Sequence, residues 1–154
     1  MTEVLFYHLE RRSLDDVLPG LIEKTLERGW RALIRCESAE RAEAIDNRLW
    51  TFSEQTFLPH AQLGDGDAGR QPVLITLEET NANKADVLFV VGGAPPPAWD
   101  GAAANSFARI VLLFDGRDPQ LLQSARAAWK SAKETGLDVT YWKESAGGKF
   151  EKQS

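Results

Sequence analysis

Short, continuously apolar segments alternate with amphipathic segments along this chain, and that alternation constrains the fold more than any other feature. DVLFVV at residues 86–91 and RIVLLF at residues 109–114 are apolar after their first residue. Strands buried on both faces of a parallel sheet have this composition. Further strands are predicted at residues 4–9, 30–36, 73–77 and 137–142. The pattern predicts an α/β fold, a single-domain sandwich with a mostly parallel sheet.

The first amphipathic segment is predicted to be a helix that Ser13 caps and Gly29 ends. Asp15 and Asp16 favour the positive N-terminal end of such a helix. Pro19 lies off the apolar face, which leaves open a start nearer to that proline.

A second helix is predicted after Ser38, with an inward face formed by Ala42, Ile45 and Leu49. The last helix covers residues 119–135, and Gly136 ends it. Residues 50–71 are expected to be irregular, and GGAPPPAWDG is a loop because its prolines exclude a helix or a central strand. Residues 144–154 are polar and are expected to form a flexible tail.

Composition and charge narrow the functional classes. The chain has 154 residues, 43% of them hydrophobic, and a net charge of −5, which argues against a binder that covers nucleic acid or anionic membrane with its whole surface. Cys36 is the single cysteine, which fits a reducing compartment. MTEVLFYHLERR has no signal-peptide pattern, and no apolar run approaches the roughly 18 residues of a membrane span. We therefore expect a cytoplasmic protein.

No phosphate-binding motif stands between a strand and a helix. Glu10-Arg11-Arg12-Ser13 follows the first strand without a glycine, and Pro95 comes too soon after Gly92-Gly93. Nucleotide binding through either motif is therefore not expected.

Candidate catalytic and metal-binding residues do not form a set. Gly64-Asp65-Gly66-Asp67 resembles the start of a calcium loop, but no Glu closes it at the twelfth position. Cys36 ends an apolar strand and is interpreted as a small buried residue. His8 and His60 have no second ligand at metal-binding spacing. We predict no catalytic residue, no metal and no cofactor.

The last helix carries an unusual border of aromatic and basic residues. At about 100° per residue its inward stripe is formed by Leu121, Ala125, Ala128 and Ala132. Trp129 lies at the edge of that stripe, with Arg126, Lys130 and Lys133 further round. Such a border suits a peptide that ends in an aromatic residue and its free carboxylate. The alternative is a tryptophan packed at a sheet edge beside solvated cations, and the residues alone leave both open.

A second aromatic cluster follows the second helix. Trp50, Phe52 and Phe57 lie close together in the irregular segment. They either fold back over the core or form an exposed apolar patch of the kind that marks a protein interface.

In these features the chain resembles the chi subunit of bacterial DNA polymerase III holoenzyme, an accessory protein of the clamp loader. The resemblance rests on the order and spacing of several short matches: Phe6-Tyr7, Arg35-Cys36-Glu37, Leu49-Trp50, Phe57-Leu58-Pro59-His60, Gln71-Pro72-Val73, Ala125-Arg126 with Trp129-Lys130, and Trp142-Lys143. It implies a chi-like domain over residues 1–143, with a nucleotide-binding-like fold that lacks a phosphate loop, in agreement with the missing glycines.

The resemblance implies a non-enzymatic role. The family binds the acidic C-terminal tail of single-stranded DNA-binding protein, which ends in proline and phenylalanine. Arg126, Trp129 and Lys130 match the residues that the family uses for this tail, although the aromatic residue is usually tyrosine. Gln123 and Lys133 are expected beside them, with Gln123 where some relatives have a basic residue. Asp115 falls where a relative can have an apolar pocket residue.

The resemblance also implies a link to the clamp loader through the psi subunit. The family uses an aromatic pair for psi, and this pair matches Trp50 and Phe57. Little direct DNA binding and no membrane contact are expected. The alternatives are a direct nucleic-acid-binding module that uses the basic strip of the last helix, and an enzyme with a site near His60.

Overall fold

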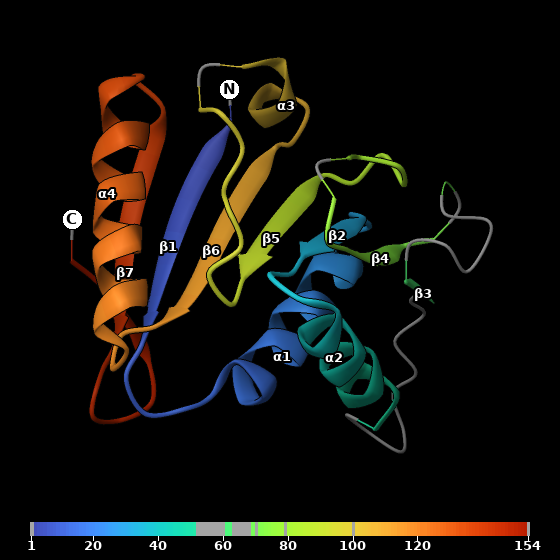
Figure 1. The fold of residues 1–154 in the computed structure, drawn as a ribbon, viewed down its shortest axis with the longest axis horizontal. Coiled ribbons are helices and arrows are strands. Elements are labelled where there is room, and N and C mark those ends of the chain that lie inside the picture. Colours follow the sequence, from blue (N-terminus) through green and yellow to red (C-terminus); the bar gives the residue numbers. More distant parts are fainter. Residues whose placement is uncertain are drawn as a thin grey trace.

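The computed structural model describes residues 2–51, 61–62, 69, 71–78, 80–99 and 101–153. Figure 1 shows a twisted sheet accompanied by helices. The strands are β1 (Glu3–Leu9), β2 (Ala32–Arg35), β3 (Ala61–Gln62), β4 (Val73–Thr76), β5 (Val87–Val91), β6 (Arg109–Asp115), β7 (Asp138–Glu144) and β8 (Phe150–Lys152). The helices are α1 (Leu14–Glu27), α2 (Ala39–Thr51), α3 (Ala102–Asn105) and α4 (Pro119–Glu134).

In the described part of the chain, the strands form one 8-stranded sheet in the order β3-β4-β2-β5-β6-β1-β7-β8. Each neighbouring pair is parallel except β7 and β8, which are antiparallel. The predicted α/β class with a mostly parallel sheet is confirmed.

Alternation along each strand divides the core between the two faces of the sheet. In β1, Val4 and Phe6 pack in a cluster that includes Ala125 and Ala132 of α4. Leu5 of the same strand packs in a second cluster, with the buried residues of α1 and α2. Both faces are thus covered, which explains why the central strands are apolar throughout.

The predicted caps of α1 are present. The Ser13 hydroxyl accepts the backbone N–H of Asp16 at 3.3 Å, and the Asp16 carboxylate accepts the backbone N–H of Ser13 at 3.1 Å. This reciprocal pair is a capping box. Gly29 follows the helix with a φ of +78°, a conformation that favours glycine.

Pro19 differs from the prediction, because it lies inside α1 and is buried rather than marking a later start. A proline within a helix leaves the carbonyl four residues earlier without its donor. That carbonyl belongs to Asp15, and Arg48 Nε of α2 donates to it at 2.9 Å. A neighbouring helix thus supplies the hydrogen bond that the proline removes.

Residues 144–154, which the sequence analysis expects to form a flexible tail, include a strand in the structure. Glu144 is buried, and β8 extends the sheet beside β7. Two smaller differences are that α2 continues through Trp50 to Thr51, and that the short helix α3 was not predicted. No helix among the described residues is long and apolar enough to cross a membrane.

Candidate functional site

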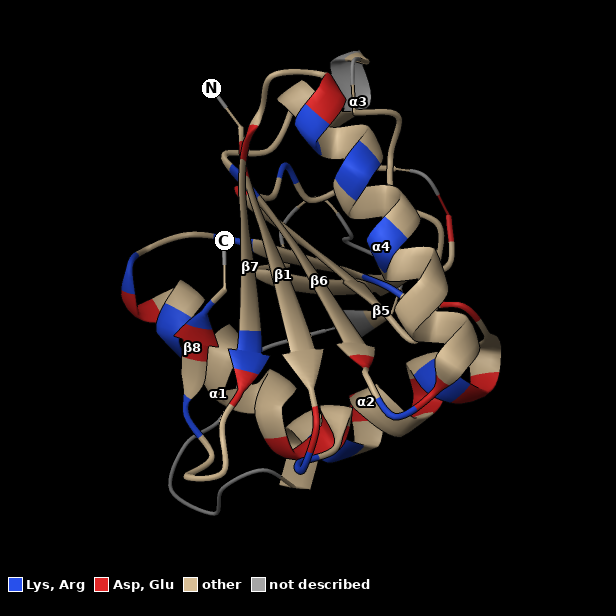
Figure 2. Ribbon diagram, turned by 90° about the vertical axis from the view of Figure 1, so that its left-hand side faces the viewer, with Lys and Arg blue, Asp and Glu red and all other residues tan. Residues whose placement is uncertain are grey.

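Helix α4 brings its aromatic and basic border to the edge of the sheet. Asp118 caps the helix by accepting the backbone N–H groups of Gln120 and Leu121. As predicted, Ala125 and Ala132 are buried against the sheet. Trp129 is partly buried beside them, and Arg126 is exposed. Figure 2 shows the Lys and Arg positions of α4 following one another along the helix.

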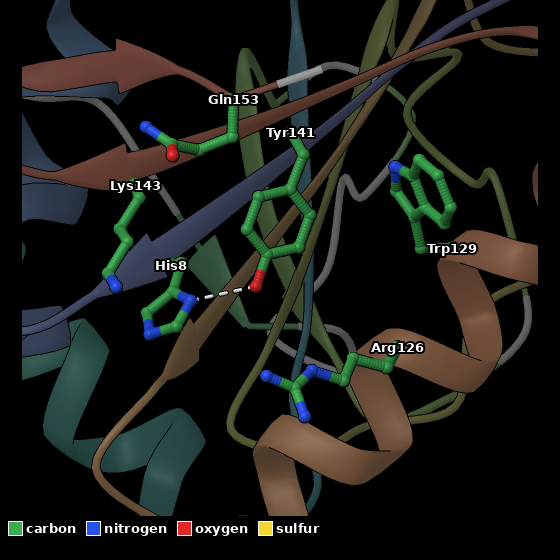
Figure 3. Close-up of a pocket in the computed structure, with 6 residues that line it drawn as sticks. All are labelled: His8, Arg126, Trp129, Tyr141, Lys143 and Gln153. Carbon is green, nitrogen blue, oxygen red and sulfur yellow. Dashed lines mark hydrogen bonds between the residues drawn. The ribbon is translucent and has the colours of Figure 1, made fainter.

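A pocket of about 310 Å³ lies between α4 and the strands β1 and β7. Its lining comes from segments far apart in the sequence: His8, Arg126, Trp129, Tyr141, Lys143 and Gln153. Figure 3 shows Arg126 and Lys143 reaching from opposite sides toward His8 and the Tyr141 hydroxyl, with Trp129 beyond the Tyr141 ring. The pocket therefore has a polar, cationic end and an aromatic end.

At the polar end, His8 connects Tyr141 to an acidic residue. His8 Nδ1 is hydrogen-bonded to the Tyr141 hydroxyl at 2.7 Å, and Nε2 lies 2.7 Å from Glu10 Oε1. Burial lowers the pKa of His8 below its ordinary value of 6.5, against the raising effect of Glu10, so the imidazole is neutral at pH 7. We assign the proton to Nε2, which faces the carboxylate, and Nδ1 then accepts from the tyrosine hydroxyl.

Two cations act on this end of the pocket. Lys143 Nζ lies 3.6 Å from Glu10 Oε1. Burial raises the pKa of Tyr141 above its ordinary value of 10.0, and the charge of Arg126 works in the opposite direction. The guanidinium is thus close enough to act on the tyrosine electrostatically. Tyr141 stays protonated and donates its hydroxyl proton to His8 Nδ1, which leaves its oxygen as an acceptor for a ligand donor.

The aromatic end combines a flat apolar surface with an unused donor. Trp129 and the Tyr141 ring both line the pocket, and Lys133 Nζ lies 5.3 Å from the centroid of the Trp129 ring. Trp129 Nε1 is buried and has no hydrogen-bond partner among the described residues. Because Nε1 has essentially no exposed surface, a ligand in the pocket meets the apolar face of the indole and not its N–H group.

The hairpin of β7 and β8 is held to the β1–α1 loop by one carboxylate. Glu144 Oε1 accepts the backbone N–H groups of Glu10, Arg11 and Arg12 at 3.0, 2.7 and 3.0 Å. Glu144 Oε2 accepts from Arg12 Nε at 2.6 Å. Burial works to raise the pKa of Glu144, but these hydrogen bonds outweigh it and lower the pKa from 4.5 to about 2.

The structure brings only part of the predicted tail-binding set together. Arg126 and Trp129 line the pocket, whereas Lys130 and Gln123 are exposed on α4 and do not line it. Lys133 contacts the Trp129 ring. Asp115 is not part of the lining either, and its carboxylate pairs with Arg117 at 2.9 Å.

His8, Tyr141, Lys143 and Gln153 were not predicted as site residues. A signal for them exists in the strand pattern, since Tyr141 and Lys143 are two residues apart on β7 and therefore point to the same face. His8 and Lys143 are also register partners in neighbouring parallel strands. Gln153 was assigned to the flexible tail, yet its backbone N–H donates to Tyr141 O at 2.7 Å.

The other residues considered in the sequence analysis do not line the pocket or lie outside the described residues. Cys36 is buried, as predicted, and burial raises the pKa of its thiol from 9.0 to about 12. The thiolate nucleophile is therefore scarcely populated at neutral pH. Trp50 lies at the end of α2 with 53% of its surface exposed. Phe57, His60 and the calcium-like segment 64–67 lie outside the described residues.

The chain is similar to proteins of one family over nearly its whole length. The family model described as "DNA polymerase III chi subunit, HolC" matches residues 1–140. DNA polymerase III subunit chi of Pseudomonas aeruginosa is 30% identical over 142 residues, 90% of this chain and 94% of that protein. DNA polymerase III subunit chi of Escherichia coli is 27% identical over 153 residues, 93% of this chain and 100% of that protein.

A shorter match concerns Rickettsia prowazekii. Its "Probable DNA polymerase III subunit chi" is 30% identical over 91 residues, which are 59% of this chain and 55% of that protein. The family model ends at residue 140, so Tyr141, Lys143 and Gln153 of the pocket come after the matched region.

Proposed function

The chain belongs to the DNA polymerase III chi subunit family, and with it to the polymerase III assembly; from this premise we propose that its pocket binds the acidic C-terminal tail of single-stranded DNA-binding protein. The chain then connects that protein to the clamp loader. Its role is one of binding, without catalysis of its own.

The pocket beside α4 is the observation that supports this proposal. It sets the guanidinium of Arg126 next to the flat surfaces of Trp129 and Tyr141. A peptide that ends in phenylalanine presents a phenyl ring and a carboxylate on the same residue. The ring fits between aromatic surfaces, where edge or offset contacts are favourable, and the carboxylate fits a guanidinium that donates several hydrogen bonds.

The exposed cations of α4 have a second role in this proposal. Lys130 and Lys133 follow Arg126 along the helix, are exposed and do not line the pocket. Aspartates that precede the end of the tail would pair with them through weak, solvent-screened contacts. Gln123, one turn before Arg126, adds no charge to this strip. Many tails on coated DNA would then raise the overall affinity through avidity.

Titration of a peptide copied from the tail of the host's single-stranded DNA-binding protein tests the proposal. We expect Arg126→Ala to weaken binding by about 10- to 100-fold, since hydrogen bonds to charged groups contribute about 1.5–3 kcal/mol. Added salt should also weaken binding of the peptide to the unaltered chain. Arg28→Ala is the matched control, because Arg28 is exposed at the end of α1, away from the pocket.

Naked single-stranded DNA distinguishes the alternative function. If the basic strip of α4 binds nucleic acid directly, the DNA should bind without the tail peptide and lose affinity steeply with salt. Normal peptide binding by Arg126→Ala would contradict the proposal.

We also propose that Trp50 contributes to the contact with psi or another clamp-loader component, together with Phe57. The large exposed fraction of Trp50, 53%, supports this assignment, because tryptophan is enriched in the centres of protein interfaces.

A further inference from the structure

We propose that Lys143 of β7, rather than Lys130 of α4, is the second cation that recognises the terminal carboxylate of the bound tail, opposite Arg126. This inference rests on the proposed tail-binding function and concerns how the same pocket selects the free end of a peptide.

The position of Lys143 is fixed by the sheet. Lys143 pairs with His8 in the parallel register of β1 and β7, and both side chains line the pocket. Figure 3 shows the Lys143 side chain extending toward His8 from one side while Arg126 reaches the same region from α4. Two cations from different elements therefore converge on the end of the pocket that holds the Tyr141 hydroxyl.

The two ends of the pocket share Tyr141, whose ring lines the aromatic end and whose hydroxyl lies at the polar end beside His8 (Figure 3). The cavity of about 310 Å³ is at the small end of ligand sites, which range over about 300–1,000 Å³. Only the last residue of a peptide carries a carboxylate directly beside its side chain. With an aromatic side chain against Trp129 and Tyr141, its own carboxylate reaches the polar end. A residue within a chain has an uncharged amide there and offers neither cation a carboxylate.

Lys143 can exchange Glu10 for a ligand carboxylate at a small cost in free energy. Lys143 Nζ lies 3.6 Å from Glu10 Oε1, and the two side chains are 46% and 34% exposed. Exposed ion pairs of this kind are weak. A ligand carboxylate that also gains Arg126 can therefore compete with Glu10 for the ammonium group.

Lys130 provides the contrast. It is exposed on α4 and does not line the pocket, although its sequence neighbour Trp129 does. A lysine in this position attracts acidic residues of the tail from outside the pocket. Its effect should depend on the total charge of the peptide and not on the chemistry of its last group.

Two peptides that differ only at their end test this division. One is the acidic tail ending in proline and phenylalanine with a free carboxylate, and the other is the same peptide with a C-terminal amide. Dissociation constants are measured by calorimetry for the full chain and its variants, and the amide-to-carboxylate ratio of these constants is compared. In the unaltered chain we expect the carboxylate to bind at least about tenfold more tightly, equivalent to about 1.4 kcal/mol.

Lys143→Ala should lower this ratio several-fold, and Lys143→Met should do the same while keeping an apolar stem. Lys130→Ala should weaken both peptides by the same factor and leave the ratio unchanged. Lys149→Ala is the control for an exposed lysine in the turn between β7 and β8. Circular dichroism and melting temperature verify that each variant is folded.

The outcomes separate the inference from the function on which it rests. An unchanged ratio in both Lys143 variants, with tight binding of the carboxylate peptide, overturns the role of Lys143 and leaves the tail-binding function standing. A ratio that falls in Lys130→Ala instead assigns the carboxylate to α4 and also overturns the inference. Failure of the unaltered chain to bind either peptide removes the proposed function itself.

Discussion

Trp129 stands where the resemblance to the chi family implies a tyrosine. The indole differs from a phenol in its N–H group, and the surroundings of that group decide what the difference means. The ring forms an apolar surface of the pocket, while Nε1 is buried and unpaired among the described residues. Leaving a buried donor without a partner costs about 1–3 kcal/mol. Because Nε1 has essentially no exposed surface, this cost falls on the stability of the fold, and a bound peptide meets the ring of Trp129.

Replacement of Trp129 by phenylalanine tests this role, since phenylalanine keeps a flat apolar ring and removes the donor. We expect the affinity for the tail peptide to stay within about twofold of that of the unaltered chain, because the N–H group that is removed has no exposed surface for a ligand to reach. Calorimetric titration is the measurement, with Trp129→Ala as the reference that removes the ring as well. A loss of about tenfold or more in Trp129→Phe would show instead that Nε1 donates a hydrogen bond to the peptide.

At the scale of single residues, the helical period was sufficient to predict the residues that α4 contributes to the pocket. It predicted the inward alanines of α4 and placed Arg126 and Trp129 at the border, where they line the pocket. It could not show that Lys143 lines the pocket and Lys130 does not, because the helical period describes one helix and gives no information on the strand that faces it. That information lies in the pairing of β1 with β7.

At the scale of elements, the hairpin of β7 and β8 is the part that the sequence did not predict. Residues 144–154 are polar, and composition alone favours a disordered tail. The hairpin is stabilised by contacts that no local pattern reveals. Phe150 packs edge-on against Tyr7 with ring centroids 4.7 Å apart, and Arg12 Nη2 donates to Gly148 O at 2.6 Å.

Glu144 also occupies the backbone N–H groups that a phosphate loop would use to bind a ligand. In nucleotide-binding folds, the backbone N–H groups after the first strand receive a phosphate. Here the N–H groups of Glu10, Arg11 and Arg12 are already occupied by the Glu144 carboxylate. The sequence showed that glycines are absent from this loop, but it could not show that an internal anion takes the place of the ligand.

Glu144→Gln should destabilise the fold in a pH-dependent manner. The pKa of Glu144 is lowered from 4.5 to about 2 in the folded chain, and the side chain is fully buried. A lowered pKa stabilises the fold above the unfolded value, by about 3 kcal/mol here, and this contribution is lost as the pH falls from about 4.5 toward 2. Because glutamine keeps one acceptor, we expect a loss of about 2–3 kcal/mol at neutral pH.

Urea unfolding of both chains across this pH range measures the effect. The difference in free energy of unfolding between the two chains should shrink as the pH falls below 4.5. Glu151→Gln is the control, because Glu151 is an exposed carboxylate on β8. A difference that stays constant with pH would contradict the assignment of the lowered pKa to Glu144.

At the scale of the whole molecule, an acidic chain displays a local basic strip. The net charge is −5, while the charged residues of α4 are basic except at its last position. Figure 2 shows acidic positions distributed over the rest of the chain, including the segment that follows β1. Such a distribution repels a long polyanion and still accepts a short acidic peptide at one place.

The two proposed contact surfaces belong to different sides of the sheet. The pocket adjoins α4, whose buried residues pack on one face, and Trp50 belongs to α2, whose buried residues pack on the other. Substitutions that share no partner usually have additive effects. One substitution should therefore weaken binding of the tail alone, and another should weaken binding of the clamp loader alone.

Trp50→Ala should weaken capture of the host's psi or clamp-loader subunits by at least about 30-fold, since a central interface tryptophan contributes about 2 kcal/mol or more. Its affinity for the tail peptide should be unchanged, whereas Arg126→Ala should show the opposite pair of results. Leu77→Ala is the matched control, because Leu77 is the other large hydrophobic residue found exposed in the described part of the chain, at 49%. Binding of each purified partner to immobilised chain measures the two contacts separately. If Trp50→Ala binds clamp-loader subunits normally, its exposed indole is not the contact; if it also loses the tail, the two surfaces are coupled through the sheet.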